Sequence, residues 1–306
     1  MEDTQVRDKI RNNSAQKKHI SDKVMPNFFL LMASLSVLTT LGIVIILVTD
    51  ASKFFSAVPL TEVFSTELAP LRKDPSFGIL PLISGTIITT LIAMLVAVPV
   101  GLAAAIYLSQ FASDKLRRVF KPMMEVLAGI PTIVYGFFAY SFVTPLLMKI
   151  IPSLQAKNAL SPGLVMGIMI IPMVASLSED AMNSVPEIIR EGSLGLGATK
   201  LETAFKVIIP GAISGIMASI VLALSRAIGE TMIVTIASGS SKNFTLDITQ
   251  SMQTMTAYIV EFTSGDAGSG TLGYYSLYAV GLILFIFTLG INLLAQYISR
   301  KYREVY

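Results

Sequence analysis

Long apolar stretches alternate with short polar segments along nearly the whole chain. A helix needs about 20 apolar residues to cross roughly 30 Å of hydrocarbon, whereas the strands of a membrane barrel are shorter and alternate apolar with polar side chains. The stretches here have the length that helices require. The pattern predicts an all-α integral membrane protein with six transmembrane helices, at 27–48, 78–108, 123–147, 162–177, 211–236 and 272–298.

Composition supports the membrane assignment. Hydrophobic residues make up 53% of the chain and charged residues 14%, against about a quarter charged in an average soluble domain. The chain has no cysteine and a single histidine, His19, in the polar N-terminal segment. Disulfides, thiolate metal sites and Ser-His-Asp triads are therefore excluded, and we expect no metal site. The net charge of +3 does not indicate nucleic-acid binding, because no basic cluster is interleaved with aromatic side chains.

Lysines and arginines are distributed unevenly between the connecting segments. Of the 23, sixteen lie before the first span or after the second, fourth and sixth, and six lie in the alternate connectors. Cytoplasmic flanks of membrane helices retain basic residues, so we expect both termini in the cytoplasm. The chain then consists of a cytoplasmic tail at 1–26, a membrane domain at 27–300 and a short cytoplasmic end at 301–306.

Small residues recur at every fourth position in two of the predicted helices. In lipid, small side chains let helix backbones approach closely. We therefore expect the helices at 78–108 and 211–236 to lie in the protein interior. The recurring residues are Ala93, Ala97, Gly101 and Ala105 in the first, and Gly211, Gly215, Ser219, Ala223, Ala227, Thr231 and Thr235 in the second.

The segment at 187–210, EIIREGSLGLGATKLETAFKVIIP, interleaves apolar with charged residues. Helix-stop rules predict a short helix that breaks at 195–197 and a second helix that ends near Pro210. The segment resembles the EAA loop of ABC-transporter permeases, with an acidic start, a glycine turn and a closing proline. The positions that match, with Gly and Ser in place of two alanines, are Glu191, Gly192, Ser193, Gly197, Val207, Ile209 and Pro210.

The resemblance extends to the membrane helices. Residues 97–101, 127–136 and 225–232 are similar to segments of the phosphate-specific (Pst) permeases, and the Gly-Glu-Thr-Met at 229–232 resembles the PstC-type subunit. This implies a type I ABC importer permease, or MetI-like, fold over 27–300, with the loop at 187–210 coupling the permease to its ATPase.

The family implies that the chain is a multi-pass protein of the cell (cytoplasmic) membrane and that it works with a set of partners. They are a PstA-like second permease, a dimer of PstB-like ATP-binding subunits and an extracytoplasmic PstS-like protein that delivers inorganic phosphate. The chain has no phosphate-cradling Gly-rich loop, so we expect no enzyme activity and no cofactor of its own, with ATP used by the partner. The alternatives are a PstA-type subunit, a permease for molybdate or sulfate, and an ion-coupled secondary transporter or channel.

Two charges, Arg226 and Glu230, lie within the predicted helix at 211–236. A charge in mid-membrane costs about 2.5–3.5 kcal/mol on insertion scales and is by default functional. One interpretation is an ion pair that fixes the helix in its bundle. The other is that Arg226 offers its planar guanidinium to phosphate oxygens, with Glu230 holding it and with hydroxyls from Ser225 and Thr231 nearby.

Other charged residues are given simpler roles by the sequence. We expect Glu125 at the membrane interface beside Lys121 rather than in the pathway. We expect a solvated surface on the loop that precedes the last helix, formed by Lys242, Asp247, Glu261 and Asp266.

Overall fold

The computed structural model describes residues 2–266, 268 and 270–301 and is mostly helical. The chain divides into two units, residues 1–50 and 51–306, and each is described by itself. Helix α1 (Glu2–Ala57) is continuous through the first unit and includes Pro26. The helix is thus longer at both ends than the predicted 27–48, while the stretch that is long and apolar enough to cross a membrane is Val24–Ala57. The first 41 residues contain no glycine and a single proline, so little in this segment stops a helix.

Five helical stretches in the described part of the chain are long and apolar enough to cross a membrane. A sixth span results if the bent pair Asp114–Gly129 and Thr132–Met148 is counted as one, in agreement with the six predicted helices. The five are Val24–Ala57, Leu80–Phe111, Leu160–Asn183, Lys200–Ile228 and Leu272–Tyr297.

Helices α3 (Leu80–Ile106), α7 (Leu160–Asn183) and α10 (Ile209–Ile228) pack together as the centre of the second unit. Glycines allow the close approach of α3 and α7: a Cβ on Gly101 would lie 2.7 Å from the Cβ of Val174, and one on Gly167 would lie 2.8 Å from the Cβ of Val96. The small residues predicted at 93, 97, 101 and 105 are all buried, as are those at 219, 223 and 227. The prediction that the stripe faces the interior is confirmed for the helix at 78–108. For the helix at 211–236 it is confirmed only in the middle, because the residues at 211, 215, 231 and 235 are half-buried.

The predicted helix at 123–147 is not continuous. Helix α4 (Asp114–Gly129) and helix α5 (Thr132–Phe138) meet at a bend of 86°. The cause is Pro131, because a proline pushes the preceding residue out of the helical region, and Ile130 is extended at φ −66°, ψ 129°. The chain continues through the π-helix η2 (Ala139–Val143) into α6 (Thr144–Met148).

The predicted helix at 211–236 is also broken. Helix α10 ends at Ile228 and α11 (Met232–Ala237) begins after three intervening residues. Upstream, α8 (Glu187–Gly195) ends before Gly197, which adopts φ +91°, so the predicted glycine turn is present. The second loop helix does not end near Pro210. Helix α9 (Lys200–Thr203) and η3 (Ala204–Ile208) lead directly into α10, whose first turn tolerates a proline that lacks an N–H.

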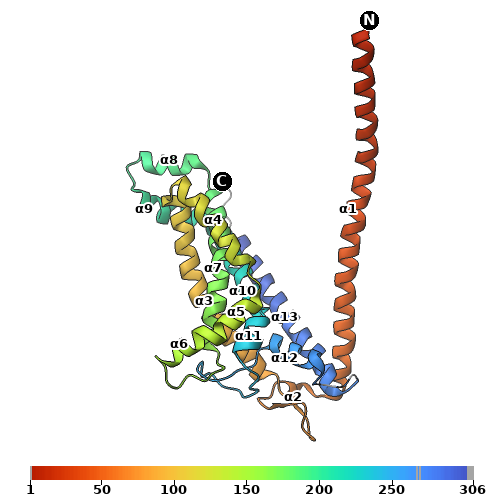
Figure 1. Ribbon diagram of the computed structural model, residues 1–306, viewed down its shortest axis with the longest axis vertical. Helices are drawn as coiled ribbons and strands as arrows, with labels where there is room; N and C mark the ends of the chain where they lie inside the picture. The colour runs from red at the N-terminus through yellow and green to blue at the C-terminus, as the bar shows by residue number, and fades with distance from the viewer. Residues whose placement is uncertain (1, 267, 269, 302–306) are drawn as a thin grey trace. The chain divides into compact units, whose positions relative to one another are not determined.

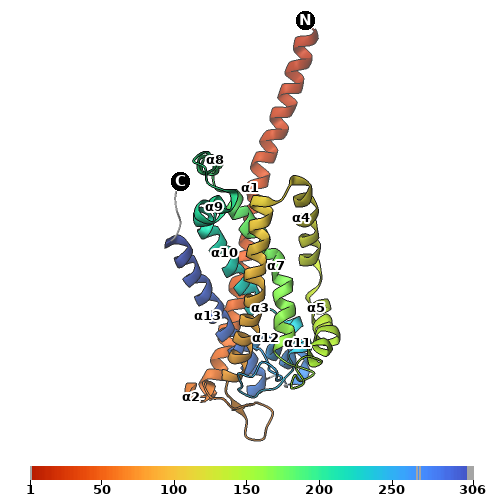
Figure 2. The same ribbon diagram turned by 90° about the vertical axis from the view of Figure 1, so that its left-hand side faces the viewer.

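The remaining elements close the two ends of the second unit. Figures 1 and 2 show α8, α9 and the start of α4 at one end, called here the coupling end, and α2 and α12 at the opposite end. The predicted C-terminal end at 301–306 lies outside the described residues apart from 301. The other elements are α2 (Leu60–Val63), the antiparallel pair β1 (Leu68–Ala69) and β2 (Ser76–Phe77), the π-helix η1 (Tyr107–Phe111), α12 (Met255–Glu261), η4 (Phe262–Asp266) and α13 (Leu272–Lys301).

Candidate functional site

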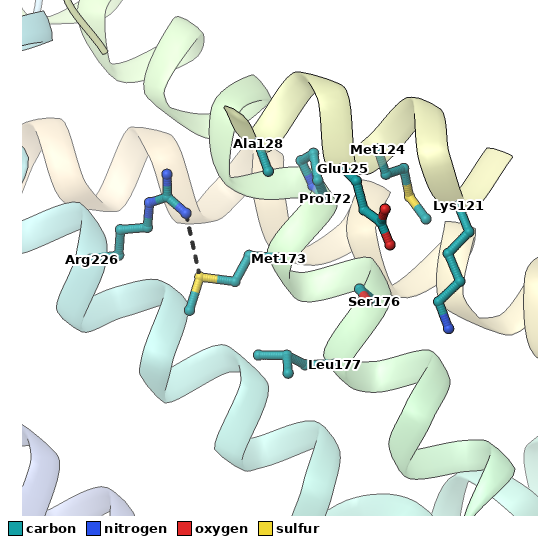
Figure 3. Close-up of a pocket in the computed structure, with 9 residues that line it drawn as sticks. All are labelled: Lys121, Met124, Glu125, Ala128, Pro172, Met173, Ser176, Leu177 and Arg226. Carbon is teal, nitrogen blue, oxygen red and sulfur yellow. Dashed lines mark hydrogen bonds between the residues drawn. The ribbon is translucent and has the colours of Figure 1, made fainter. Parts of the chain in front are cut away.

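Arg226 lies in the last turn of α10 and faces a cavity of about 280 Å³ between α4, α7 and α10. Its Nη1 lies 4.0 Å from the Sδ of Met173 on α7 (Figure 3). Pro172, which lies inside α7, is one of the residues on the cavity wall. The lining residues are Lys121, Met124, Glu125, Ala128, Pro172, Met173, Ser176, Leu177 and Arg226.

The cavity wall combines two cations and one carboxylate with apolar side chains. Figure 3 shows Arg226 on one side and Lys121 on the other, with Glu125 between them on α4. Ser176 adds a hydroxyl from α7. Arginine and lysine together suit an oxyanion, since guanidinium presents several N–H donors and lysine adds a compact charge. Glu125, which we expected at the membrane interface, is thus placed on the wall of the cavity.

Glu230 does not pair with Arg226 in the described structure. Its Oε1 accepts hydrogen bonds from the backbone N–H groups of Met232 at 3.0 Å and Ile233 at 3.2 Å. The buried carboxylate thereby caps the first turn of α11, where backbone donors have no partner within the helix. Its backbone oxygen also accepts from the Oγ1 of Thr256 at 2.7 Å. The break between α10 and α11 gives Glu230 a structural partner that an unbroken helix would not.

The two hydroxyls expected near Arg226 are turned elsewhere. The Oγ of Ser225 donates to Oδ1 of Asn292 on α13 at 2.6 Å, and the Oγ1 of Thr231 donates to the backbone oxygen of Gly229 at 3.1 Å. Neither residue lines the cavity. Of the four residues predicted for the pathway, the structure places Arg226 alone on the cavity wall.

A second group of charges lies next to the cavity on the coupling-end side of α7. Glu179 has 0% exposed surface, with Oε1 at 3.5 Å from Nε of Arg117 and Oε2 at 3.7 Å from Nζ of Lys121. The prediction missed Glu179 because it ended the helix at 177. The signal was present, since Pro172, Ala175 and Glu179 follow helical spacing on a buried face.

The loop at 187–210 presents apolar side chains at its surface. Leu196 is 92% exposed and Ile188 77% exposed. Thr199 and Glu202 form a reciprocal capping box that starts α9, and Ser193 Oγ lies 2.9 Å from Thr203 Oγ1, which ties α8 to the end of α9. A folded loop with uncovered apolar residues has the character of a docking surface.

Residues 97–304 match the family described as binding-protein-dependent transport system inner membrane component. A probable ABC transporter permease protein, YqgH of Bacillus subtilis, is 32% identical over 79% of this chain and 78% of its own. The phosphate transport system permease protein PstC of Mesorhizobium japonicum is 36% identical over 74% of each chain. The probable PstC of Methanocaldococcus jannaschii is 31% identical over 82% of this chain and 87% of its own.

Solved structures of importers share the fold. An inward-facing structure of the MetNI methionine ABC transporter superposes with a TM-score of 0.56 at 16% identity, over 74% of this chain and 95% of that chain. A bacterial ABC transporter involved in import of the acidic polysaccharide alginate gives 0.55 at 14% identity, over 85% of this chain and 95% of that chain. At these identities the likeness is one of fold, and it confirms the predicted MetI-like architecture.

Proposed function

The chain belongs to the family of binding-protein-dependent transport system inner membrane components, and we propose that it is the PstC-type permease subunit of an ATP-driven importer of inorganic phosphate. Relatives named as phosphate transport permeases, 31–36% identical over most of the chain, support this substrate.

One observation carries the anion assignment. The guanidinium of Arg226 lines the cavity, and its hydrogen-bond acceptor among the described residues is the sulfur of Met173 rather than a carboxylate. The wall as a whole carries two cations, Arg226 and Lys121, against one carboxylate, Glu125. A permanent positive charge in the membrane is costly when its counter-charge is incomplete. An oxyanion that enters the cavity supplies that charge, and its tetrahedral oxygens match the guanidinium donors. Binding at such a transit site is weak enough for release.

The proposed assembly follows the importer plan. A PstA-like second permease packs in the membrane, and a dimer of PstB-like ATPase subunits docks on α8 and α9 in the cytoplasm. A PstS-like binding protein delivers phosphate at the opposite end. In this arrangement both termini are cytoplasmic, the chain binds no cofactor, and ATP is hydrolysed by the partner. The exposed apolar residues of the loop, Ile188 and Leu196 among them, favour such docking.

The test is uptake by the complex reconstituted in proteoliposomes with its second permease, ATPase and binding protein. We expect import of radiolabelled phosphate that requires ATP and the binding protein, with little import of sulfate or molybdate. Uptake without ATP by this chain alone would instead make it a secondary transporter or channel. Preferential import of sulfate or molybdate would contradict the phosphate assignment.

A further inference from the structure

Glu179 is a fully buried carboxylate whose charge is balanced by two cations of α4. Its Oε1 lies 3.5 Å from Nε of Arg117 and accepts from Nδ2 of Asn183 at 3.5 Å. Its Oε2 lies 3.7 Å from Nζ of Lys121 and has no hydrogen bond among the described residues. A buried charge is stable only when it is paired, so the loss of one cation would markedly destabilise the negative charge of Glu179.

The two cations are held differently. The guanidinium of Arg117 donates from Nη2 to the backbone oxygens of Leu108 at 2.8 Å and Ser109 at 3.3 Å, which fixes it against η1. Lys121 has no such backbone anchor in the described contacts, and its other partner is Oδ1 of Asp180 at 3.2 Å. The side chain of Asp180 is 58% exposed, so this contact is screened by water. Lys121 is therefore the less firmly held of the two cations, and its contact with Glu179 at 3.7 Å is longer than its contact with Asp180.

Lys121 also belongs to the cavity wall, together with Arg226. A doubly or singly charged oxyanion that entered this cavity of about 280 Å³ would compete with Glu179 for this ammonium group. One lysine thus connects the occupied state of the cavity with the charge balance of a buried residue on α7.

Glu179 lies close to the point where α7 leads into the loop at 187–210, so an exchange at this residue can affect that loop. Glu179 lies in the last two turns of α7, eight residues before α8 begins at Glu187. Asn183, one turn further along, accepts at Oδ1 from Ser109 of η1. The group therefore joins α4, η1 and the end of α7 at the place where the chain turns into the loop at 187–210.

We propose that Glu179 is a positioning residue for phosphate transport, which holds Lys121 at the coupling end of the cavity until the anion replaces it as the partner of that lysine. The departure of Lys121 from Glu179 loosens the α4–α7 contact and signals an occupied cavity to the coupling loop. This inference rests on the proposed function, and it involves no covalent step.

The competing explanation is that the ion pairs only hold α4 against α7. If so, their loss should reduce assembly, and it should reduce transport and ATP hydrolysis in equal proportion. If Lys121 instead exchanges Glu179 for the anion, the loss should reduce the stimulation of ATP hydrolysis by substrate while assembly stays intact.

The experiment compares Glu179→Gln with the matched control Asp180→Asn in the full reconstituted complex. Uptake of inorganic phosphate and ATPase activity, with and without phosphate-loaded binding protein, are normalised to assembled complex. For Glu179→Gln we expect uptake and substrate stimulation to fall roughly tenfold, a size typical of coupling between sites, while unstimulated ATPase activity persists. For Asp180→Asn we expect a change below about twofold, because exposed pairs contribute little.

Lys121→Met provides a second variant that leaves the Arg117–Glu179 pair in place. We expect a similar loss of stimulation, and no further loss in the double variant, because the two residues act as one unit. Wild-type uptake and stimulation in Glu179→Gln, equal loss of stimulated and unstimulated ATPase activity, or additive losses in the double variant would each overturn the exchange. If the wild-type complex imports no phosphate, the proposed function fails instead, which separates the two outcomes.

Discussion

Each end of the second unit holds a lysine against a glutamate. At the coupling end Lys121 lies 3.7 Å from Glu179, and at the opposite end Lys242 lies 3.1 Å from Glu261. The side chains of the opposite-end pair are 20% and 23% exposed, so the expectation of a solvated surface is wrong for both residues. Two similar pairs thus occupy different settings in one bundle.

The opposite-end pair is closed. Nζ of Lys242 lies 5.2 Å from the ring centroid of Phe262 and 5.8 Å from that of Tyr258. The second carboxylate oxygen of Glu261 accepts a hydrogen bond from Gln253. At the coupling end, by contrast, one oxygen of Glu179 has no hydrogen-bond donor in the described structure and its lysine opens onto the cavity. Closed pairs fix a structure, whereas an open pair beside a cavity is suited to exchange.

The largest expected effect is the loss of uptake when Arg226, on the cavity wall, is replaced. Replacement of Arg226 by alanine removes the charge, and replacement by lysine keeps the charge but loses the planar fork. Because hydrogen bonds to charged groups contribute about 1.5–3 kcal/mol, we expect Arg226→Ala to lower uptake roughly 10- to 100-fold and Arg226→Lys to lower it less. Uptake by reconstituted complexes, normalised to assembly, checks this. Normal transport by Arg226→Ala would contradict the proposal that the cavity binds phosphate during transport.

The closed pair should affect stability instead of transport. Lys242→Met leaves Glu261 partly buried without its cation, and after allowance for its partial exposure we expect a loss of about 1–3 kcal/mol in stability. Thermal unfolding of the purified complex measures this loss. Uptake per assembled complex should remain within about twofold of wild type. A large transport defect with unchanged thermal stability would show that the two ends do not differ as described.

Variants of Glu230 distinguish the capping of α11 from the ion pair with Arg226 that the sequence allowed. Glu230→Gln keeps an acceptor oxygen for the N–H groups of Met232 and Ile233, so we expect near-normal uptake. Glu230→Ala removes the cap and should cost about 1 kcal/mol of stability. Thermal unfolding and uptake together test both variants. A transport loss in Glu230→Gln as deep as in Arg226→Ala would restore the interpretation of a functional pair.

The sequence predicted the parts of the fold that depend on local pattern. Apolar length located α3, α7 and α13, and the four-residue spacing of small residues identified which helices are buried. Pro131 was visible in the sequence, but whether a proline kinks a helix or breaks it by 86° depends on what packs beside it. The same holds for the break after Ile228, which only the folded chain reveals.

The candidate site was predicted only in part, because some of its contacts depend on packing that the sequence does not show. Arg226 was recognisable because a charge in an apolar run is conspicuous. The partner of Glu230 is a pair of backbone N–H groups that exist as free donors only because the helix breaks. Glu179 and Lys121 are 58 positions apart in the sequence, and their proximity arises from the packing of α4 against α7.

The smallest effect concerns the opposite-end loop. Hydrogen bonds from the Thr249 side chain and backbone and from Gln250 lower the pKa of Asp247 below its ordinary value. A carboxyl group whose pKa is lower in the folded than in the unfolded state stabilises the fold at pH values above its unfolded-state pKa. This stabilisation is lost as the pH falls through the folded-state pKa. Hydrogen exchange of residues 245–251 should therefore quicken on acidification. In Asp247→Asn it should change less with pH, and an identical acid response would contradict this.

The most direct test of the central claim asks whether phosphate occupies the cavity beside Arg226. Since the chain has no cysteine, a single Ser176→Cys on the cavity wall reports on occupancy, and Ser225→Cys, outside the cavity, serves as the control. Labelling by a small thiol reagent is followed in the reconstituted complex as it turns over. We predict that phosphate delivered by the binding protein slows labelling at position 176 and leaves position 225 unchanged, whereas equal labelling with and without phosphate at 176 would contradict the account.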